Sequence, residues 1–231
     1  MRQFGNFYIV ATPIGNLEDI SARAIRVLKD VDLVLAEDTR ETAKILQKYN
    51  ISTPQLSYRD QNHVKVLSKV LETLQNGQNI ALTSDSGTPL ISDPGFKLVQ
   101  ELIRQNVDIF CIPGPTAVIS ALAVSGLPTD KFTFLGFLPK GKAKRQKILQ
   151  EYAKLDSTLV IYESPYKIEG ILEEIRECLE DRQVCVANEL TKKFEKVYRG
   201  NVTQVLEQLK ERPVKGECVV LIGKEGFEYG S

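Results

Sequence analysis

Short apolar runs alternate with amphipathic stretches along most of the chain. In the first half the apolar runs cover residues 7–11, 33–36, 80–83 and 109–112, and each has the length of a buried strand. Apolar side chains between the runs recur at helical spacing. One stripe is Ile20, Ala24, Val27, Leu28 and Val31, and another is Leu67, Val70, Leu71 and Leu74. This alternation predicts an α/β unit with a mostly parallel sheet.

The pattern is interrupted once, at Pro113-Gly114-Pro115, and residues 116–125 after it are small and apolar, as in a tightly packed helix. Further strands are predicted at residues 133–135, 158–162, 184–187 and 218–222. A helix stripe at Ile168, Ile171, Leu172, Ile175 and Leu179 follows Ser164-Pro165, a predicted N-cap and first-turn proline. The last stripe is Val202, Val205, Leu206 and Leu209. We therefore predict two α/β domains, residues 1–113 and 114–231.

Composition narrows the classes of partner. Lys+Arg and Asp+Glu both number 30, so the overall charge does not indicate nucleic acid or a membrane, although a neutral protein can still carry a basic face. The sequence contains no run of 18 apolar residues, so no membrane span is predicted. The N-terminus lacks a small-residue cleavage site, so no signal peptide is expected. The four cysteines form no C-x-x-C pair and are predicted to be buried thiols of a cytoplasmic protein, the alternative being a disulfide or metal site. The single histidine, His63, excludes a metal site made of several histidines.

Three loops rich in glycine and proline begin at predicted strand ends: "ATPIGNLED" (11–19), "LTSDSGTPLISDPG" (82–95) and "IPGPTA" (112–117). Glycine allows close backbone approach, proline fixes φ, and ligands of open α/β sheets lie beyond the carboxyl ends of strands. Pro94 and Pro115 stand where helices are predicted to begin, and helix N-termini favour a carboxylate or phosphate. Each loop taken alone is also explained as a structural turn. Together they predict a ligand cleft, while the missing G-x-G-x-x-G and G-x-x-x-x-G-K-[ST] patterns disfavour nicotinamide dinucleotides and Walker-type nucleotide hydrolysis.

Seven longer blocks carry a resemblance to a known family. They are "YIVATPIGNLEDIS", "LAEDTRETAKIL", "LTSDSGTPLISDPGF", "IPGPTAVISALAVSGLP", "FTFLGFLPK", "YESPYKI" and "NELTKKFEKVYRG", and they extend from Tyr8 to about Gly223. In order and content the chain resembles the ribosomal RNA small subunit methyltransferase I family of the tetrapyrrole (corrin/porphyrin) methylase superfamily. The resemblance implies two α/β domains with the cofactor cleft between them, S-adenosylmethionine as cofactor and a cytoplasmic homodimer. It also implies methylation of a cytidine 2′-hydroxyl in the decoding region of 16S ribosomal RNA in the 30S subunit.

The resemblance also implies cofactor-binding positions. Asp85 stands where the superfamily's Gly-Asp-Pro loop contacts the cofactor, although the residue alone is also explained as a turn-capping carboxylate. The implied set is Pro13, Ile14, Gly15, Asp85, Gly87, Thr88, Pro89, Thr116, Ala117, Tyr162, Glu189 and Leu190. Two positions depart from the family pattern: Tyr166-Lys167 replaces His-Arg, and Asn188 replaces Arg. Both departures remove a donor or change its geometry.

Methyl transfer to a ribose hydroxyl requires in-line positioning and a base or polarising cation, because the hydroxyl is a poor nucleophile until its proton begins to leave. The "AEDTR" segment offers Glu37, Asp38 and Arg40 after the second strand, either to orient a hydroxyl or to form a structural ion pair. Lys192 is a second catalytic candidate, since a desolvated amine near a sulfonium would have a depressed pKa. Arg59 and His63 are expected on the acceptor side, with a helix cap or surface position as the alternative for His63.

The stretch "LPKGKAKRQK" is predicted to contact RNA phosphates, and its alternative is a solvated helix start. Its cationic residues are Lys140, Lys142, Lys144, Arg145 and Lys147. Two rival functions stay open. A tetrapyrrole methylase would need an apolar, aromatic-lined trough, whereas the predicted acceptor side is charged and the chain has no Trp. A non-catalytic ribosome- or RNA-binding protein with this fold would not bind the cofactor.

Overall fold

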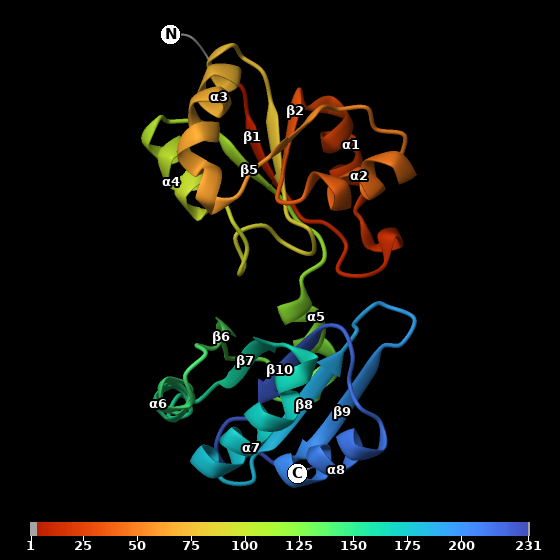
Figure 1. The fold of residues 1–231 in the computed structure, drawn as a ribbon, viewed down its shortest axis with the longest axis vertical. Helices are drawn as coiled ribbons and strands as arrows, with labels where there is room; N and C mark the ends of the chain where they lie inside the picture. Colours follow the sequence, from red (N-terminus) through yellow and green to blue (C-terminus); the bar gives the residue numbers. More distant parts are fainter. Residues whose placement is uncertain (1–3, 231) are drawn as a thin grey trace. The chain divides into compact units, whose positions relative to one another are not determined.

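A computed structural model describes residues 4–230 and divides the chain into two compact units, one ending at Thr116 and one beginning at Ala117 (Figure 1). The sequence analysis places the boundary after Pro113. The Pro-Gly-Pro segment stays with the first unit because it packs there. A Cβ atom at Gly114 would lie 3.0 Å from the Cβ atom of Ala11. The Thr88 hydroxyl donates to the Pro115 carbonyl at 3.2 Å.

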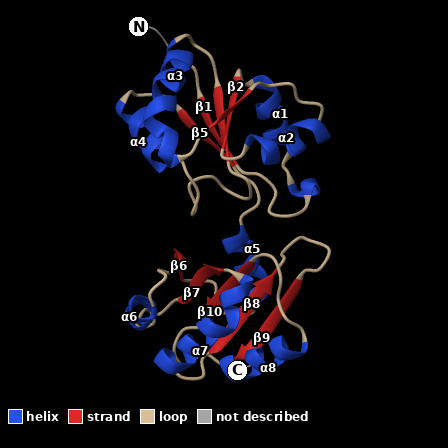
Figure 2. Ribbon diagram, in the orientation of Figure 1, coloured by secondary structure: helices blue, strands red, loops and turns tan. Residues whose placement is uncertain are grey.

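The first unit contains a five-stranded sheet in the order β3-β2-β4-β1-β5, and every strand pair in it is parallel (Figure 2). The strands are β1 Phe7–Val10, β2 Leu33–Ala36, β3 Gln55–Ser57, β4 Ile80–Thr83 and β5 Ile109–Ile112. The predicted parallel sheet is confirmed, and four of the strands were predicted. Strand β3 was missed because its three residues are mostly polar and partly buried at the sheet edge.

Helices cover both faces of this sheet. They are α1 Ala22–Asp30, α2 Thr39–Lys48, α3 His63–Gln75 and α4 Phe96–Arg104, with 3-10 turns at Leu17–Asp19 and Asp60–Asn62. Helices α1 and α2 share one apolar cluster with alternate strand residues such as Val10 and Val34. Helices α3 and α4 share the other with Phe7 and Leu35 (Figure 1). The carboxyl ends of the strands are left to the loops.

The second unit contains a mixed sheet in the order β6-β7-β10-β8-β9, in which only β6 and β7 are parallel. The strands are β6 Phe132–Phe137, β7 Thr158–Glu163, β8 Gln183–Asn188, β9 Lys196–Asn201 and β10 Cys218–Ile222. Strand β9 was not predicted, because its sequence is polar and ends in Gly200-Asn201 at a sheet edge. The central strands β7, β8 and β10 are almost continuously buried, which explains why their apolar runs were recognised.

Helices α6 Lys142–Tyr152, α7 Ile168–Leu179 and α8 Val202–Glu211 pack on one face of the second sheet around Ile161, Val186 and Val220. Helix α5 Ala117–Ser125 contacts β8 and β10 and contributes nothing to that cluster, so it covers the other face. A 3-10 turn, Pro165–Lys167, precedes α7. Pro165 begins that turn and not α7, whose N-cap is Lys167, and Ser164 makes no side-chain cap, so the predicted capping of α7 by Ser164 is wrong.

The cysteine prediction is right for two thiols and wrong for a third. Cys185 and Cys218 are buried, Cys178 is partly buried, and Cys111 is exposed; all four are free. Cys111 escapes burial because β5 is an edge strand. No helix among residues 4–230 combines the length and apolar character needed to cross a bilayer.

Two glycines should respond in opposite ways to replacement by alanine, because only one of them needs the conformational freedom of glycine. Gly95 has φ +134°, and a Cβ there would lie 2.9 Å from Cδ2 of Leu82. We expect Gly95→Ala to lower the free energy of unfolding by about 1–3 kcal/mol, from the unfavourable backbone conformation and the overlap. Gly170 lies in α7 with open space around it, so Gly170→Ala should raise stability by about 0.5–1 kcal/mol. Urea unfolding measures both, and a Gly95→Ala protein as stable as the parent would contradict the first expectation.

Candidate functional site

The first two glycine-proline loops are joined by a short backbone bridge. The N–H of Thr12 donates to the Gly87 carbonyl at 2.8 Å, and the N–H of Gly87 donates to the Thr12 carbonyl at 3.1 Å. The buried Thr12 hydroxyl adds contacts to the carbonyls of Ser84 and Gly87, at 3.1 and 3.3 Å. The loops after β1 and β4 are therefore fastened to each other, as neighbouring strand ends allow.

The third loop joins them through Pro115, whose carbonyl accepts from Thr88 at 3.2 Å. Gly87 lies at the meeting point with φ +82°, and a Cβ there would lie 3.3 Å from the Ile14 side chain and 3.9 Å from the Pro115 carbonyl. The first unit thus assembles most of the predicted cofactor positions, with Pro13, Ile14 and Pro89 buried in it and Gly15 and Asp85 exposed. Thr116 ends this unit and Ala117 begins α5.

The density of backbone-controlling residues in the stretch 82–95 now has a physical explanation. Besides Gly87 and Gly95, two side-chain-bearing residues, Leu90 and Ser92, have positive φ values of 73° and 64°. A segment in which the backbone takes positive φ values at so many positions cannot form a regular helix or strand. Its course brings Thr88 to the third loop and Asp85 to the segment after β2.

That segment is "AEDTR", and Asp38 in it is held by several hydrogen bonds. Its carboxylate caps α2 by accepting from the Arg40 N–H at 2.9 Å. Nε and Nη2 of Arg40 also donate to it, at 2.9 and 2.5 Å. The Asp38 N–H donates in turn to Oδ1 of Asp85 at 2.9 Å, which links the segment to the stretch 82–95. Hydrogen bonds and the charge of Arg40 hold the pKa of Asp38 far below its usual range.

Glu37 lies in a different environment. Its carbonyl accepts from Arg59 Nε at 3.0 Å and from the Ser57 hydroxyl at 3.3 Å, but among residues 4–230 its carboxylate has no hydrogen bond or ion pair. Partial burial and the carboxylate of Asp85 raise the pKa of Glu37. The pKa values of the two adjacent carboxylates, Glu37 and Asp38, are thus shifted in opposite directions. Asp38 and Arg40 form the structural ion pair that the sequence left open, and Glu37 keeps its carboxylate available.

Asp93 was not assigned a role from the sequence. Burial, followed by the charge of Glu37, raises the pKa of Asp93 to about 6. Asp85 also acts on it, so Glu37, Asp38, Asp85 and Asp93 form one acidic cluster at the strand ends. A Ser-Asp-Pro sequence reads locally as a turn, and only the folded loop shows that its carboxyl group faces other carboxylates.

The other acceptor-side candidates follow strand β3. Arg59 contacts the Glu37 carbonyl and lies 3.8 Å from the Asp38 carboxylate, with half of its side chain exposed. His63 is the first residue of α3 and does not cap it, since the N-cap position is Asn62; its Nδ1 lies 3.0 Å from the hydroxyl of the buried Tyr58. The structure therefore brings Arg59 to the acidic cluster and gives His63 a structural partner.

In the second unit the "NELTKK" turn is held by ion pairs. Lys192 Nζ donates to Glu189 at 2.8 Å and to Glu217 at 2.9 Å. Burial lowers the pKa of Lys192, but these two carboxylates outweigh it, so the pKa is raised. The sequence analysis expected a depressed pKa for Lys192 next to a sulfonium, and the two carboxylates act against that depression. Glu189 and Thr191 have positive φ values of 50° and 67°, and Leu190 is buried between them.

Asn188 and Tyr162, two further positions singled out from the sequence, each contact other residues of the second unit. Asn188, where the family pattern has Arg, is buried, and its amide donates to the carbonyls of Lys215 and Glu217 at 2.6 and 3.1 Å. Tyr162, near the end of β7, contacts the rings of Phe134 and Phe137 at centroid distances of 4.9 and 5.5 Å. Asn188 thus fastens the segment before β10, and Tyr162 belongs to an aromatic group.

The basic stretch divides into paired and unpaired cations. Arg145 donates Nε and Nη2 to the Glu174 carboxylate at 2.8 and 2.5 Å, and Nη1 to the carbonyls of Pro139 and Lys140. Lys142 pairs with Glu177 at 2.7 Å. Arg145 was predicted to contact phosphate, and in the structure its guanidinium fastens the β6–α6 loop to α7. Within the described chain no side-chain partner is found for Lys140, Lys144 and Lys147.

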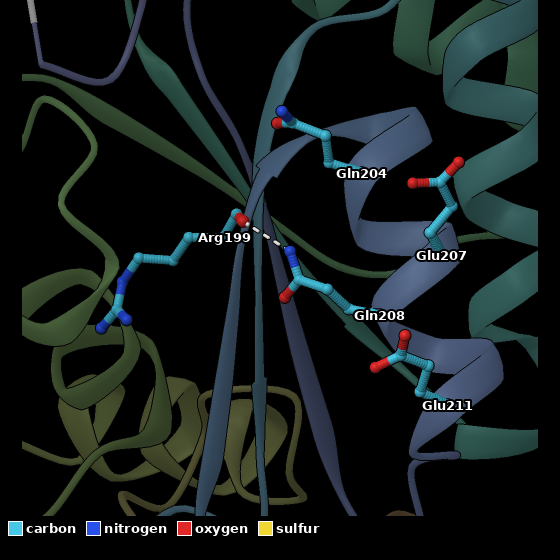
Figure 3. Close-up of a pocket in the computed structure, with 5 residues that line it drawn as sticks. All are labelled: Arg199, Gln204, Glu207, Gln208 and Glu211. Carbon is cyan, nitrogen blue, oxygen red and sulfur yellow. Dashed lines mark hydrogen bonds between the residues drawn. The ribbon is translucent and has the colours of Figure 1, made fainter.

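Neither pocket found on the second unit contains a predicted site residue. One, of about 370 Å³, is lined by Arg199, Gln204, Glu207, Gln208 and Glu211 (Figure 3). Three of its lining side chains, Arg199, Gln204 and Gln208, form hydrogen bonds with the backbone of the protein. Gln208 donates to the Arg199 carbonyl at 3.0 Å, and the Arg199 guanidinium points away from α8 to the carbonyls of Val124 and Ser125 (Figure 3). The other, of about 660 Å³, lies beside Lys154, Cys178 and Arg182.

Known proteins similar in sequence show the family to which this chain belongs. The sequence model of the Tetrapyrrole (Corrin/Porphyrin) Methylases matches residues 6–206. The chain belongs to this family. Two relatives named ribosomal RNA small subunit methyltransferase I confirm the closer resemblance. The protein from Thermotoga maritima is 45% identical over 96% of this chain and 100% of its own length. The protein from Synechocystis sp. is 46% identical over 95% of this chain and 79% of its own length.

Solved structures confirm the tetrapyrrole methylase fold. A cobalt precorrin-4 methyltransferase superposes with a TM-score of 0.70 at 20% identity, covering 94% of both chains. Uroporphyrin-III C-methyltransferase from Thermus thermophilus gives 0.65 at 18% identity, covering 95% of this chain and 97% of its own, and was solved with S-adenosylhomocysteine. Methyltransferases of the tetrapyrrole methylase family use S-adenosylmethionine, so the cofactor expected from the sequence is supported at the family level.

The acidic cluster makes stability depend on pH. The folded pKa of Asp93 is about 6 against an ordinary value of 3.8, so the folded state favours the protonated carboxyl group. Its stabilising effect is complete below pH 3.8 and is lost as pH rises through about 6. We expect Asp93→Asn to gain melting temperature relative to the parent between about pH 4 and 7. Asp130→Asn, at an exposed position, serves as control, and parallel pH profiles for parent and Asp93→Asn would refute the expectation.

Proposed function

We propose that the chain is an S-adenosylmethionine-dependent methyltransferase that modifies the 2′-hydroxyl of a cytidine in the decoding region of 16S ribosomal RNA, in the 30S subunit. The observation that carries the proposal is that three loops fastened together at Gly87 lie beside the acidic cluster. It is supported by the 45% identity of the chain to a ribosomal RNA small subunit methyltransferase I. The decoding-region cytidine comes from the family resemblance alone.

The residues at the joined loops fit the cofactor chemically. S-adenosylmethionine is a cation at sulfur and nitrogen and supplies the transferred methyl group when bound. Carboxylates of the acidic cluster complement that positive charge, and Gly87 leaves space for backbone approach because it has no Cβ. We assign to its binding the residues predicted from the sequence in these loops: Pro13, Ile14, Gly15, Asp85, Gly87, Thr88, Pro89, Thr116 and Ala117.

Glu37 is the residue proposed to accept the proton of the ribose hydroxyl. A general base works best when its pKa lies near the working pH, and partial burial and Asp85 move the pKa of Glu37 in that direction. Asp38 is unsuitable, because Arg40 occupies both of its oxygens. Arg40 in turn is bound to Asp38, so Arg59, half exposed beside the Glu37 carbonyl, is the better placed cation for an adjoining phosphate.

Several parts of the proposal rest on the resemblance alone. They are the adenosine-facing roles of Tyr162, Glu189 and Leu190, the cofactor cleft between the two domains, the homodimer and the cytoplasmic location. Lys192 is reassigned as a residue that positions Glu189, since its ammonium is bound by two carboxylates.

The proposal is tested by incubating the protein with labelled S-adenosylmethionine and 30S subunits lacking the modification, with free 16S RNA alongside. Label in a single 2′-O-methylcytidine of the decoding region is the expected result. Label on tetrapyrroles only would support the small-molecule rival. A non-catalytic RNA-binding protein would give neither label nor a thermal shift with the cofactor.

Asp85 provides a test of the cofactor site. Asp85→Ala removes both a charge and the acceptor of the Asp38 N–H, so it should weaken S-adenosylmethionine binding about tenfold or more and lower stability by about 1 kcal/mol. Asp85→Asn keeps an oxygen acceptor, so stability should be retained while affinity still falls. Calorimetric titration measures affinity, and parental affinity in both variants would remove Asp85 from the cofactor site.

Glu37 and Asp38 should separate catalysis from stability. Glu37→Gln should fold and bind cofactor normally but lose about 10²–10⁴ in single-turnover methylation rate, as loss of a general base does. Asp38→Asn and Arg40→Ala both remove the ion pair beside the start of α2 but leave an oxygen acceptor to cap the helix, so they should lower the melting temperature a little and leave the rate unchanged. A Glu37→Gln enzyme with parental rate would return the base role to another group.

A further inference from the structure

Strand β6 contains a bulge that changes which side chains share a face. Phe134 pairs with Val160, but Gly136 pairs with Ile161 and Phe137 with Tyr162, so residue 135 is extra. Gly136 has φ +63°, a conformation that glycine adopts without strain. In a regular strand Phe134 and Phe137 would point to opposite faces. The bulge turns both toward Tyr162, and both rings contact it edge to face.

The resulting aromatic platform, Phe134, Phe137 and Tyr162, is open to solvent at one member. Phe137 is 65% exposed. The platform lies on the face opposite the main apolar cluster of the second unit, which contains none of its three rings. The bulge puts the Phe137 ring on this face beside Tyr162, and its exposed surface is accessible to a ligand.

Cations follow the platform directly in the chain. Phe137 ends β6, and Lys140 and Lys144 lie in the loop and first helical turn after it. Arg145 fixes that loop by binding Glu174 and the carbonyls of Pro139 and Lys140. Lys142 is neutralised by Glu177, whereas within the described chain Lys140 and Lys144 have no acidic partner. An exposed ring that is followed within seven residues of chain by two unpaired lysines, one in a fixed loop and one in the first turn of α6, complements a base with its phosphate.

We propose that Phe137, supported by Tyr162, stacks on an unpaired base of the RNA acceptor while Lys140 and Lys144 bind the neighbouring phosphates. The inference rests on the proposed function and names the surface by which that substrate is held. Stacking on aromatic rings combined with cations along the backbone is the general mode of single-strand binding. The cofactor also carries an adenine ring but no phosphate, so the adjacent lysines favour RNA.

The absence of tryptophan allows a direct test. Phe137→Trp gives the protein a single tryptophan, located on the platform, and a single-stranded oligoribonucleotide of mixed sequence should quench its fluorescence. Phe132→Trp places the same probe at the other end of β6, where Phe132 is 41% exposed, and should not respond. S-adenosylmethionine alone should leave both signals unchanged, because the inference gives the platform, Tyr162 included, to RNA in place of the adenosine-facing role that the resemblance implies for Tyr162. Quenching of Phe137→Trp by the cofactor and not by RNA would overturn the proposal.

Affinity measurements test the two components separately. Phe137→Ala and Phe137→Leu should weaken binding of the oligonucleotide about tenfold, with no change in salt dependence, and Phe137→Tyr should restore it. Lys140→Ala with Lys144→Ala should flatten the salt dependence by roughly 0.7 for each phosphate that a lysine no longer neutralises. Phe132→Ala is the matched control. Parental RNA affinity in Phe137→Ala would overturn the inference.

The proposed function fails separately from this inference. If the parent protein methylates 30S subunits and Phe137→Ala does so with unchanged KM, the platform is not the RNA contact and the enzyme assignment stands. If the parent binds the oligonucleotide through Phe137 but transfers no methyl group to any subunit, the inference stands and the proposed activity is wrong.

Discussion

The two backbone hydrogen bonds between Thr12 and Gly87 are the contact on which the first unit's site depends. They join loops that are 75 residues apart in sequence, and the buried Thr12 hydroxyl adds two more bonds to the same strand end. Gly87 must have positive φ to be there, and a side chain at this position would crowd Ile14. With Thr88 holding Pro115, three flexible connections become one fixed surface before any ligand arrives, which reduces the entropy lost on binding.

Electrostatics at this surface is governed by what each carboxylate contacts. Asp38 is surrounded by donors and stays ionised, while the pKa values of Glu37, Asp85 and Asp93 are raised first by burial and then by neighbouring carboxylates. Adjacent residues in sequence thus acquire different chemistry from their surroundings, the situation in which acid–base roles can be assigned. A bound cation would relieve the repulsion among these carboxylates, so ligand binding and protonation are coupled at the site.

Strand ends could be located from sequence because parallel sheets bury apolar runs, and the rule that loops gather at carboxyl ends then placed the three loops together. The edge strands β3 and β9 escaped because partial exposure permits polar residues such as Gln55 and Arg199. Long-range pairing was also invisible. Nothing local to Arg145 indicates Glu174, and nothing local to Lys192 indicates Glu217. Asp93 was passed over because a turn explains it locally, whereas its surroundings come from β2 and β4.

The strand order β3-β2-β4-β1-β5 has an evolutionary consequence. The loops proposed for the cofactor follow β4, β1 and β5, three adjacent strands, while Glu37 follows β2 and Arg59 follows β3 at one edge. Under the proposed function, sequence changes at that edge would alter the acceptor side, which meets the strands proposed to hold the methyl donor at the hydrogen bond between Asp38 and Asp85. A lineage built on this sheet can therefore diversify its acceptors by changes confined to one flank, which accords with a fold shared by enzymes named for corrin and porphyrin substrates and by enzymes named for ribosomal RNA.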